Sequence, residues 1–330
     1  MSAPLLEVRG LHVEYAGSGI LRSRRGTVHA LRGVNLELHA GRSLGVVGES
    51  GCGKSSLARV ALGLVAPSAG EVRWDGWTVD PGDHVRMRRM RRELQVVFQD
   101  PFGSLDPRMT AGASVEEALE ALEGLTDATA VRSRVAAAFD SVGLERGLAS
   151  RYPHELSGGQ CQRVAIARAT VVRPRLLICD EAVSALDVSV QAQIVNLLAD
   201  LSRQQGIGLL FISHNLAVVR HLCDEVVVLY LGRVVERATR ETLFATPRHP
   251  YTQALLAAVP VPDPRVASRR ATAAVAEEGS PGTQPSAGCA FAPRCPHALD
   301  ACFGRPPGLE AAGGGSVVSC HRWRELAGIA

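Results

Sequence analysis

A glycine-rich loop near residue 50 constrains the fold of this 330-residue chain more than any other feature. Residues 48–55 read Gly-Glu-Ser-Gly-Cys-Gly-Lys-Ser and fit the pattern G-x-x-x-x-G-K-[ST]. The apolar run Ser43–Val47 before the loop predicts a strand, and the residues from about Lys54 onward predict a helix. A strand, a phosphate-binding loop and a helix in this order indicate an α/β fold.

The chemistry of this loop indicates a bound nucleotide. Glycines let main-chain N–H groups approach phosphate oxygens, and the helix N-terminus adds a favourable dipole. We expect Lys54 to reach the β- and γ-phosphates and Ser55 to ligate Mg²⁺. Lys54 is the only lysine among the 36 lysine and arginine residues, which favours a specific role. The loop alone is shared by kinases, GTPases and many ATPases. The expected nucleotide-binding residues here are Gly48, Glu49, Ser50, Gly51, Cys52, Gly53, Lys54, Ser55 and Ser56.

Two carboxylates follow a second apolar run, Leu176–Cys179. This run predicts a buried strand, and the carboxyl edge of such strands is where α/β sheets place ligands. We expect Asp180 to hold Mg²⁺ and Glu181 to polarise the attacking water. A solvated acidic pair at a strand end is the structural alternative. The phosphate loop upstream favours the catalytic interpretation.

Residues 156–160, Leu-Ser-Gly-Gly-Gln, match the signature sequence of the ABC ATPase family, and the chain resembles that family here. Ser157, Gly158, Gly159 and Gln160 precede a predicted helix, Cys161–Ala169, whose N-terminus can form a second anion site. The resemblance implies that this signature contacts ATP bound to the opposite subunit. Two nucleotide domains would then close head to tail around two ATP molecules.

Further motifs follow in the order of the same family. The resemblance implies that Tyr15 stacks on adenine and that Gln99, after a predicted strand at Gln95–Phe98, senses Mg²⁺. It also implies that Ser184–Asp187 crosses the dimer interface and that His214 contacts the γ-phosphate. Any one of these residues alone is more often structural, and only the ordered set, spanning about residues 5–243, argues for function.

Two positions depart from the family pattern, since Ala182 stands in place of Pro and Cys161 in place of Arg. Neither takes part in the expected chemistry. The expected catalytic residues are Glu181, His214 and Gln99, and the expected Mg²⁺ ligands are Ser55, Gln99 and Asp180.

The strand pattern predicts the fold class and its divisions. Further strands are expected at Leu6–Tyr15, Val34–Leu38, Gly208–Ile212 and Glu225–Tyr230, with an amphipathic helix at Val190–Gln205. With the resemblance, this implies a RecA-like P-loop NTPase core sheet, an antiparallel β-subdomain and an inserted helical subdomain. The expected divisions are a nucleotide-binding domain at 1–260 with its helical subdomain at about 103–169, a linker at 261–288, and a small cysteine-rich tail at 289–330.

Three further segments resemble the oligopeptide/dipeptide branch of ABC importers, a pattern that nickel importers share: Phe98–Arg108, Val183–Ser189 and His249–Thr252. The resemblance implies two transmembrane permease subunits, a second ATPase subunit of the same or another kind, and an external solute-binding protein. The main hypothesis is ATP-driven uptake of di- or oligopeptides, with this chain at the cytoplasmic face of the membrane.

The alternative is a soluble ABC-type ATPase that acts on ribosomes or nucleic acid. Such proteins usually carry two nucleotide domains or long coiled-coil inserts, whereas this sequence has one phosphate loop and no sustained heptads. The net charge of +3 is too small to predict a nucleic-acid partner. The longest apolar runs, such as Val226–Leu231, are far shorter than the ~20 residues of a membrane-spanning helix, and Met1–Gly10 lacks the pattern of a signal peptide.

Four of the eight cysteines lie close together near the C-terminus: Cys289, Cys295, Cys302 and Cys320. Four thiolates suit an Fe–S cluster or a closed zinc site, and the spacing is wider than that of most zinc fingers. The arrangement resembles the C-terminal iron–sulfur motif of the same transporter branch. We therefore predict a [4Fe–4S] cluster, with zinc or no metal as the alternatives.

A basic run, Arg86–Arg92, precedes the strand expected at Gln95–Phe98. A solvated helix face is the simplest interpretation. The alternative is a position close to anionic lipid headgroups beneath a permease.

Overall fold

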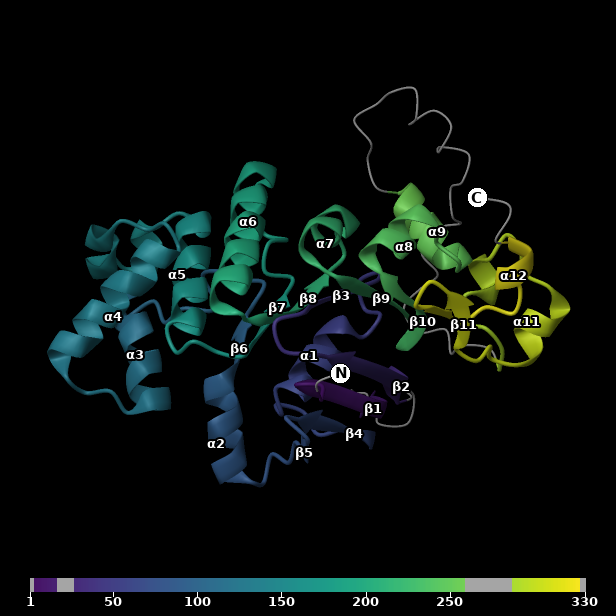
Figure 1. The fold of residues 1–330 in the computed structure, drawn as a ribbon, viewed down its shortest axis with the longest axis horizontal. Coiled ribbons are helices and arrows are strands. Elements are labelled where there is room, and N and C mark those ends of the chain that lie inside the picture. Colours follow the sequence, from purple (N-terminus) through teal and green to yellow (C-terminus); the bar gives the residue numbers. More distant parts are fainter. Residues whose placement is uncertain (1–2, 17–26, 259–286, 327–330) are drawn as a thin grey trace, which may run out of the picture.

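The computed structural model describes residues 3–16, 27–258 and 287–326. The predicted linker at 261–288 lies outside these residues, apart from its last two positions. Figure 1 shows the elements in chain order. The strands are β1 (Leu6–Tyr15), β2 (Val28–Leu38), β3 (Ser43–Val47), β4 (Ala69–Trp74), β5 (Trp77–Thr78), β6 (Leu94–Val97), β7 (Leu176–Asp180), β8 (Gly208–Ser213), β9 (Glu225–Tyr230), β10 (Arg233–Thr239), β11 (Glu310–Gly313) and β12 (Ser316–Val318).

The longer helices are α1 (Lys54–Ala61), α2 (His84–Glu93), α3 (Ala111–Glu123), α4 (Ala128–Ser141), α5 (Gly158–Thr170), α6 (Val188–Gln205), α7 (Leu216–Leu222) and α9 (Pro250–Ala257). The shorter ones are α8 (Arg240–Ala245), α11 (Asp300–Gly304), α12 (Trp323–Leu326) and the 3-10 turns η1 (Arg146–Ser150), η2 (Pro153–Glu155) and η4 (Ala292–Arg294).

An eight-stranded sheet in the order β11-β12-β10-β9-β3-β8-β7-β6 forms the centre of the molecule. Strands β3, β8, β7 and β6 are parallel, and β9 is parallel to β3. Every residue of β3 and β8 is buried, as expected for strands covered on both faces. Because side chains alternate along a strand, Leu209 and Phe211 enter one core cluster while Leu210 and Ile212 enter the other.

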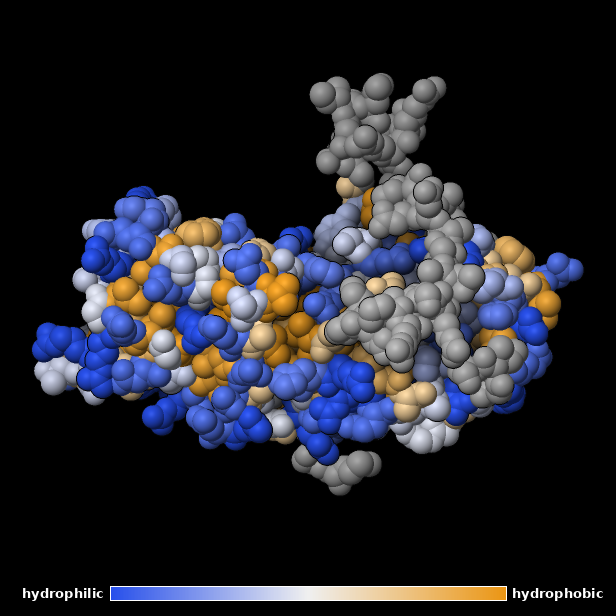
Figure 2. All heavy atoms as spheres, turned by 90° about the horizontal axis from the view of Figure 1, so that it is seen from above, coloured by the Kyte–Doolittle hydropathy of each residue, from blue (hydrophilic) through white to orange (hydrophobic). Residues whose placement is uncertain are grey.

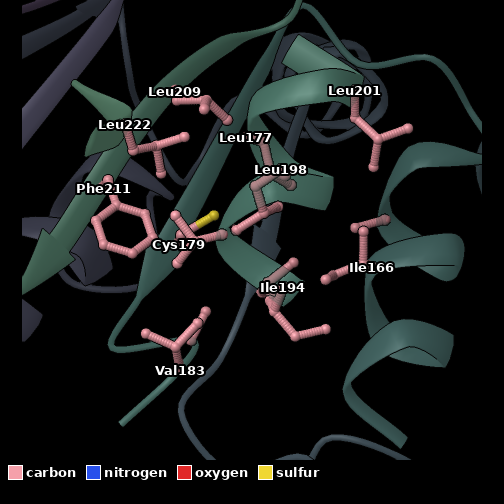
Figure 3. Packing of buried hydrophobic residues seen from close by; sticks show 14 of the residues in the cluster. Ile166, Leu177, Cys179, Val183, Ile194, Leu198, Leu201, Leu209, Phe211 and Leu222 are labelled. Atoms are coloured by element: carbon pink, nitrogen blue, oxygen red, sulfur yellow. The ribbon is translucent and has the colours of Figure 1, made fainter. Parts of the chain in front are cut away.

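The amphipathic helix α6 covers one face of this sheet. Figure 3 shows Ile194, Leu198 and Leu201 of α6 packed between β7 and β8 on one side and Ile166 of α5 on the other. The helix ends at Gln205 and is followed by Gly206, whose φ of 67° lies in the left-handed region that favours glycine.

A separate antiparallel sheet, in the order β2-β1-β4-β5, belongs to the second core cluster. Helices α3, α4 and α5 lie between β6 and β7 in the chain and form the left end of the molecule in Figure 1. Thr110 and Asp127 cap α3 and α4 by accepting main-chain N–H groups of the first turn. The predicted fold class, an α/β core with an antiparallel sheet and a helical insert, is confirmed.

Several predicted elements differ in their ends. Strand β2 starts at Val28 rather than Val34, because its pairing with β1 extends to Tyr15. Strand β6 ends at Val97, so Phe98 lies outside it. Helix α5 starts at Gly158, three residues before the predicted start, because Ser157 caps it. Strands β1, β3 and β9 have the predicted bounds.

The C-terminal residues 287–326 are joined to the core sheet, which the expected separate tail did not anticipate. Strand β12 pairs antiparallel with β10, and β11 extends the edge beyond it. Phe291 is 1% exposed and belongs to the larger core cluster. This part of the chain therefore packs against the nucleotide-binding fold.

Within the described ranges, no helix is both long enough and apolar enough to cross a bilayer. Figure 2 shows apolar residues gathered among polar ones on the left half of one face, the half that contains α3–α6. On α2, Met87 and Met90 are buried and the arginines are exposed, which agrees equally with a solvated helix face and with a position close to lipid headgroups.

Candidate active site

The phosphate loop connects the buried strand β3 to helix α1. Gly53 lies at a φ of 107°, and a Cβ atom there would lie 2.3 Å from the carbonyl oxygen of Ala30. A Cβ on Gly48 would lie 2.2 Å from the carbonyl oxygen of Leu229. Both positions therefore require glycine. Between them, Ser50 and Gly51 are exposed and Cys52 is buried.

Lys54 is the first residue of α1 and is only 4% exposed. Its Nζ donates to the carbonyl oxygens of Gly48 (2.9 Å) and Glu49 (3.0 Å) and lies 3.8 Å from Oε1 of Glu181. Buried ammonium groups need such partners. The loop thus holds its single lysine beside Glu181, the residue predicted to be catalytic.

Ser55 and Asp180 come together from α1 and the end of β7. The Ser55 hydroxyl donates to Oδ1 of Asp180 across 3.2 Å. Burial raises the pKa of Asp180, and the charge of Glu181 raises it further. A hydroxyl and a carboxylate are the oxygen ligands that Mg²⁺ prefers, and a cation there would favour the ionised carboxylate. These two residues fit the predicted magnesium site.

Glu181 follows β7 in an uncommon main-chain conformation, with a φ of 51°. Its N–H donates to the carbonyl oxygen of Ile212 in β8 (3.0 Å), and its Oε2 lies 3.6 Å from Nδ1 of His214. Non-glycine residues in the left-handed region often mark functional sites, because the surrounding structure must hold them there. Here the main chain of β8 holds Glu181 beside both His214 and Lys54.

Tyr15 and Gln99 each lie at or just after the end of a strand. Tyr15, at the end of β1, donates its hydroxyl to Oγ of Ser56 in α1 (3.2 Å), so its ring stands beside the start of the helix. Gln99 is exposed, two residues after Val97, which pairs with Cys179 in β7. Gln99 thus follows the strand next to the one that ends in Asp180.

The signature residues lie at the N-terminus of α5. The Ser157 hydroxyl accepts the N–H of Gln160 (3.3 Å), and Oε1 of Gln160 accepts the N–H of Ser157 (2.9 Å), which forms a capping box. A Cβ on Gly159 would lie 2.7 Å from Val190, so this helix packs closely on α6. Among the described residues, no hydrogen bond or ion pair joins 157–160 to the phosphate loop. Within one chain these are two separate sites.

The chain is similar to known proteins in both sequence and fold. Residues 31–184 match the family model "ABC transporter", and residues 235–302 match "Oligopeptide/dipeptide transporter, C-terminal region". The chain is 49% identical to "Probable peptide ABC transporter ATP-binding protein y4tS" of Sinorhizobium fredii, over 97% of this chain and 90% of that one. It is 48% identical to "Oligopeptide transport ATP-binding protein OppF" of Escherichia coli, over 86% of this chain and 85% of the other. The chain belongs to the oligopeptide/dipeptide family of ABC transporter ATP-binding subunits.

Solved structures agree with this membership. Part of the ABC transporter complex cbiONQ, cbiO1 of Clostridium perfringens, superposes with a TM-score of 0.64 at 30% identity, over 74% of this chain and 92% of that one. The ATP-binding cassette MJ0796, a dimer in a post-hydrolysis state bound to ADP and Pi, superposes with a TM-score of 0.63 at 28% identity, over 71% of this chain and 98% of the other. This chain is an ABC-type ATPase.

One buried polar residue of this ABC subunit was missed by sequence analysis. Gln162 of α5 has no exposed surface, and its Nε2 donates to the carbonyl oxygens of Ala182 (2.6 Å) and Phe98 (3.5 Å). It therefore links the signature helix to the loop after Glu181 and to the segment that leads into Gln99. A polar residue among the apolar positions of a helix was the available signal.

A second group that sequence analysis did not assign surrounds Glu49. Arg294 pairs with its carboxylate, and the Tyr251 hydroxyl accepts its N–H. Tyr251 belongs to the segment His249–Thr252 that marked the transporter branch. Nothing in the sequence placed Tyr251 at the phosphate loop, because Tyr251 and Glu49 lie 202 residues apart in the chain.

The four C-terminal cysteines line one small cavity of about 20 Å³, together with His249 and His297. Burial raises the pKa of Cys289 and Cys295 and raises that of Cys320 to about 11, so these thiols favour the protonated form. Among the described residues, no group of three or more His, Cys, Asp or Glu is arranged to hold a metal ion. The described residues therefore show no assembled metal site for the predicted iron–sulfur cluster.

Proposed function

We propose that this chain is the ATP-hydrolysing subunit of an importer of di- or oligopeptides, bound at the cytoplasmic face of the membrane to two permease subunits and a second ATPase subunit. The observation that carries the proposal is the convergence of Lys54, Ser55, Asp180, Glu181 and His214 at the carboxyl ends of β3, β7 and β8. Membership of a transporter family supports the rest, including an external solute-binding protein that delivers the peptide.

In this proposal each residue has a defined role in hydrolysis. Lys54 and the main-chain N–H groups of the loop bind the phosphates, while Glu181 polarises the attacking water and His214 orients it. Ser55, Asp180 and Gln99 hold Mg²⁺, which supplies positive charge against the phosphates when bound. Ser157–Gln160 close on ATP held by the partner subunit, and this closure drives the permease between its access states.

A soluble ABC-type ATPase acting on ribosomes or nucleic acid is the weaker candidate. Both relatives described above are named as transport proteins. The chain matches 90% and 85% of their lengths. The exposed arginines of α2 can also be assigned within the transporter, because a subunit beneath a permease lies close to anionic lipid headgroups.

Two experiments test the transport proposal. Affinity purification of the tagged chain from gently solubilised native membranes should recover two multi-span permeases and a sibling ATPase, whereas ribosomes without a permease would favour the alternative. Deletion of the gene should abolish uptake of a labelled tripeptide, and the wild-type chain but not Glu181→Gln should restore it. Loss of labelled nickel uptake with normal tripeptide uptake would assign another solute.

We further propose that Cys289, Cys295, Cys302 and Cys320 bind a [4Fe–4S] cluster, with a zinc site as the alternative. What supports it is that four suitable ligands share one cavity wall, and that Cys289 donates its N–H to the carbonyl oxygen of Cys302 (2.7 Å). The cavity has room for about one water molecule, so a cluster requires the side chains to move outward. Binding must also displace the protons of the thiols.

Anaerobic purification with visible absorption, iron and sulfide assays tests the cluster. Cys295→Ala should lose the iron, and Cys161→Ala, at a buried cysteine remote from the cavity, should retain it. Stoichiometric zinc without iron would indicate the closed zinc site, and an intact, colourless and metal-free protein would rule out both.

A further inference from the structure

The phosphate loop contacts the C-terminal part of the chain through an ion pair between Glu49 and Arg294. Arg294 donates from Nη1 to Oε2 of Glu49 (2.8 Å) and from Nη2 to Oε1 (3.0 Å), which is the two-point geometry of a strong arginine–carboxylate pair. The side chains are 15% and 32% exposed, so the pair is largely shielded from water. Glu49 is the residue directly after Gly48 in the loop.

Two aromatic rings lie against this arginine, and a third packs against both of them. The rings of Tyr230, Tyr251 and Phe291 contact one another with centroid separations of 4.5–5.4 Å. The guanidinium carbon of Arg294 lies 5.9 Å from the ring centroids of both Tyr230 and Phe291, within the range of cation–π attraction. The arginine is therefore fixed by a core cluster and has little freedom to leave Glu49.

The main chain of Glu49 is held as well. Its N–H donates to the hydroxyl of Tyr251 (2.9 Å), and its carbonyl oxygen accepts from Lys54 (3.0 Å). With the Arg294 pair, Glu49 has a fixed partner for its side chain, its N–H and its carbonyl. Because a loop that is already ordered loses less entropy when it binds, this arrangement favours nucleotide binding.

The charge of Glu49 gives the pair a second consequence. A carboxylate beside the polyphosphate chain of ATP repels it, and such repulsion is strong where water is scarce. Arg294 pairs with this carboxylate and neutralises its charge. Without the arginine, Glu49 would oppose the binding of the anion that the loop is built to hold.

We propose that Arg294 is a positioning residue for nucleotide binding: it acts through Glu49 to order the phosphate loop and to cancel a negative charge beside the phosphates. The proposal rests on the assignment of residues 48–55 as the phosphate loop. It gives the C-terminal part of the chain a direct role at the ATP site, independent of any metal in the cysteine cavity.

A double-mutant cycle on the full-length chain tests this role. The probe is ATP with a fluorescent methylanthraniloyl group, in the presence of Mg²⁺, and the KM and kcat of ATP hydrolysis are measured in parallel. Arg294→Gln should weaken binding about tenfold and raise KM equally, with kcat within about twofold, because hydrogen-bonded charges are lost and a charge is exposed. Arg294→Lys keeps the charge but not the two-point geometry, so we expect a loss of about threefold.

A second set of variants separates the effect of the Glu49 charge from the effect of anchoring the C-terminal residues. The affinity of Glu49→Gln is the reference for the cycle, and the double variant should bind like Glu49→Gln, because the repelling carboxylate is then absent. Arg324→Gln is the matched control, since Arg324 pairs with Glu310 in the same part of the chain. Circular dichroism and thermal unfolding identify variants that fail to fold. If Arg294→Gln does not fold, Arg294→Lys with and without Glu49→Gln replaces it.

Two results would overturn the proposal: unchanged affinity and KM in the Arg294 variants, or a loss of affinity that remains the same in the double variant. Unchanged affinity together with a lower melting temperature would reduce the pair to an anchor for the C-terminal residues. A wild-type chain that does not bind the probe at all would instead overturn the assignment of the phosphate loop.

Discussion

The phosphate loop and the signature turn are both glycine-rich segments at helix N-termini, yet the chain completes only one of them. The loop between β3 and α1 receives Lys54, Asp180, Glu181 and the Arg294 brace from its own chain. At the start of α5, the polar groups of Ser157 and Gln160 bond to each other, and Ser157 is exposed. A helix start whose groups are exposed and carry no charged partner offers an anion site that only another molecule can fill.

The difference indicates how the work is divided between two subunits. In the proposed mechanism, binding of ATP depends on the loop and can occur in a single chain, whereas turnover needs the signature of a partner as well. Substitutions in the two regions should therefore separate binding from turnover.

The largest expected effect is on turnover and comes from Glu181. Glu181→Gln keeps the shape of the side chain but removes the group that polarises water, so we expect the ATPase rate to fall at least about a hundredfold. Binding of the fluorescent ATP should remain within about threefold, and closed dimers should accumulate on size-exclusion chromatography. Glu225→Gln is the control, because Glu225 is a half-exposed carboxylate paired with Arg237 elsewhere in the fold. Full turnover in Glu181→Gln would refute the catalytic assignment.

The next effect distinguishes the two helix starts directly. Lys54→Ala should weaken ATP binding about ten- to a hundredfold, since charge-assisted hydrogen bonds to the phosphates are lost. Ser157→Arg should leave the affinity of the isolated chain within about twofold and still abolish turnover and ATP-dependent dimers. Equilibrium titration and size-exclusion chromatography measure the two properties. Equal loss of affinity in both variants would break the distinction, because it would place the signature in the same chain's binding site.

Sequence analysis identified the loop and the strands around it because these features are local. The unbroken apolar run Ser43–Val47 predicts a buried strand, and the glycines in the eight residues after it predict the loop. Both β3 and α1 start as predicted. Sequence analysis also singled out Asp180 and Glu181, because the phosphate loop upstream favours a catalytic role over a solvated acidic pair at a strand end. The start of α5 was placed three residues late because the capping role of Ser157 was not considered.

What sequence analysis missed depends on contacts between distant residues. Arg294 reaches Glu49 across 245 positions, and no local pattern marks an arginine for such a contact. The pairing of β12 with β10 is similar: β12 has only three residues, and its partner strand lies 77 or more positions earlier in the chain. Such short strands carry too little periodic signal to be recognised before the sheet is known.

The smallest expected effect concerns the adenine end of the site and compares Tyr15 near the phosphate loop with Tyr152 near the signature turn. Tyr15 stands beside α1, whereas Tyr152 is 40% exposed near the signature turn, stacked on His154. If adenine stacks on Tyr15, Tyr15→Ala should weaken binding of the fluorescent ATP about five- to tenfold. Tyr15→Phe should cost about twofold, because it removes only the hydrogen bond to Ser56 that orients the ring. Tyr152→Ala is the matched control in the other region and should leave the affinity within about twofold. An affinity that falls with Tyr152→Ala and not with Tyr15→Ala would move the adenine contact to the signature side and overturn the division argued above.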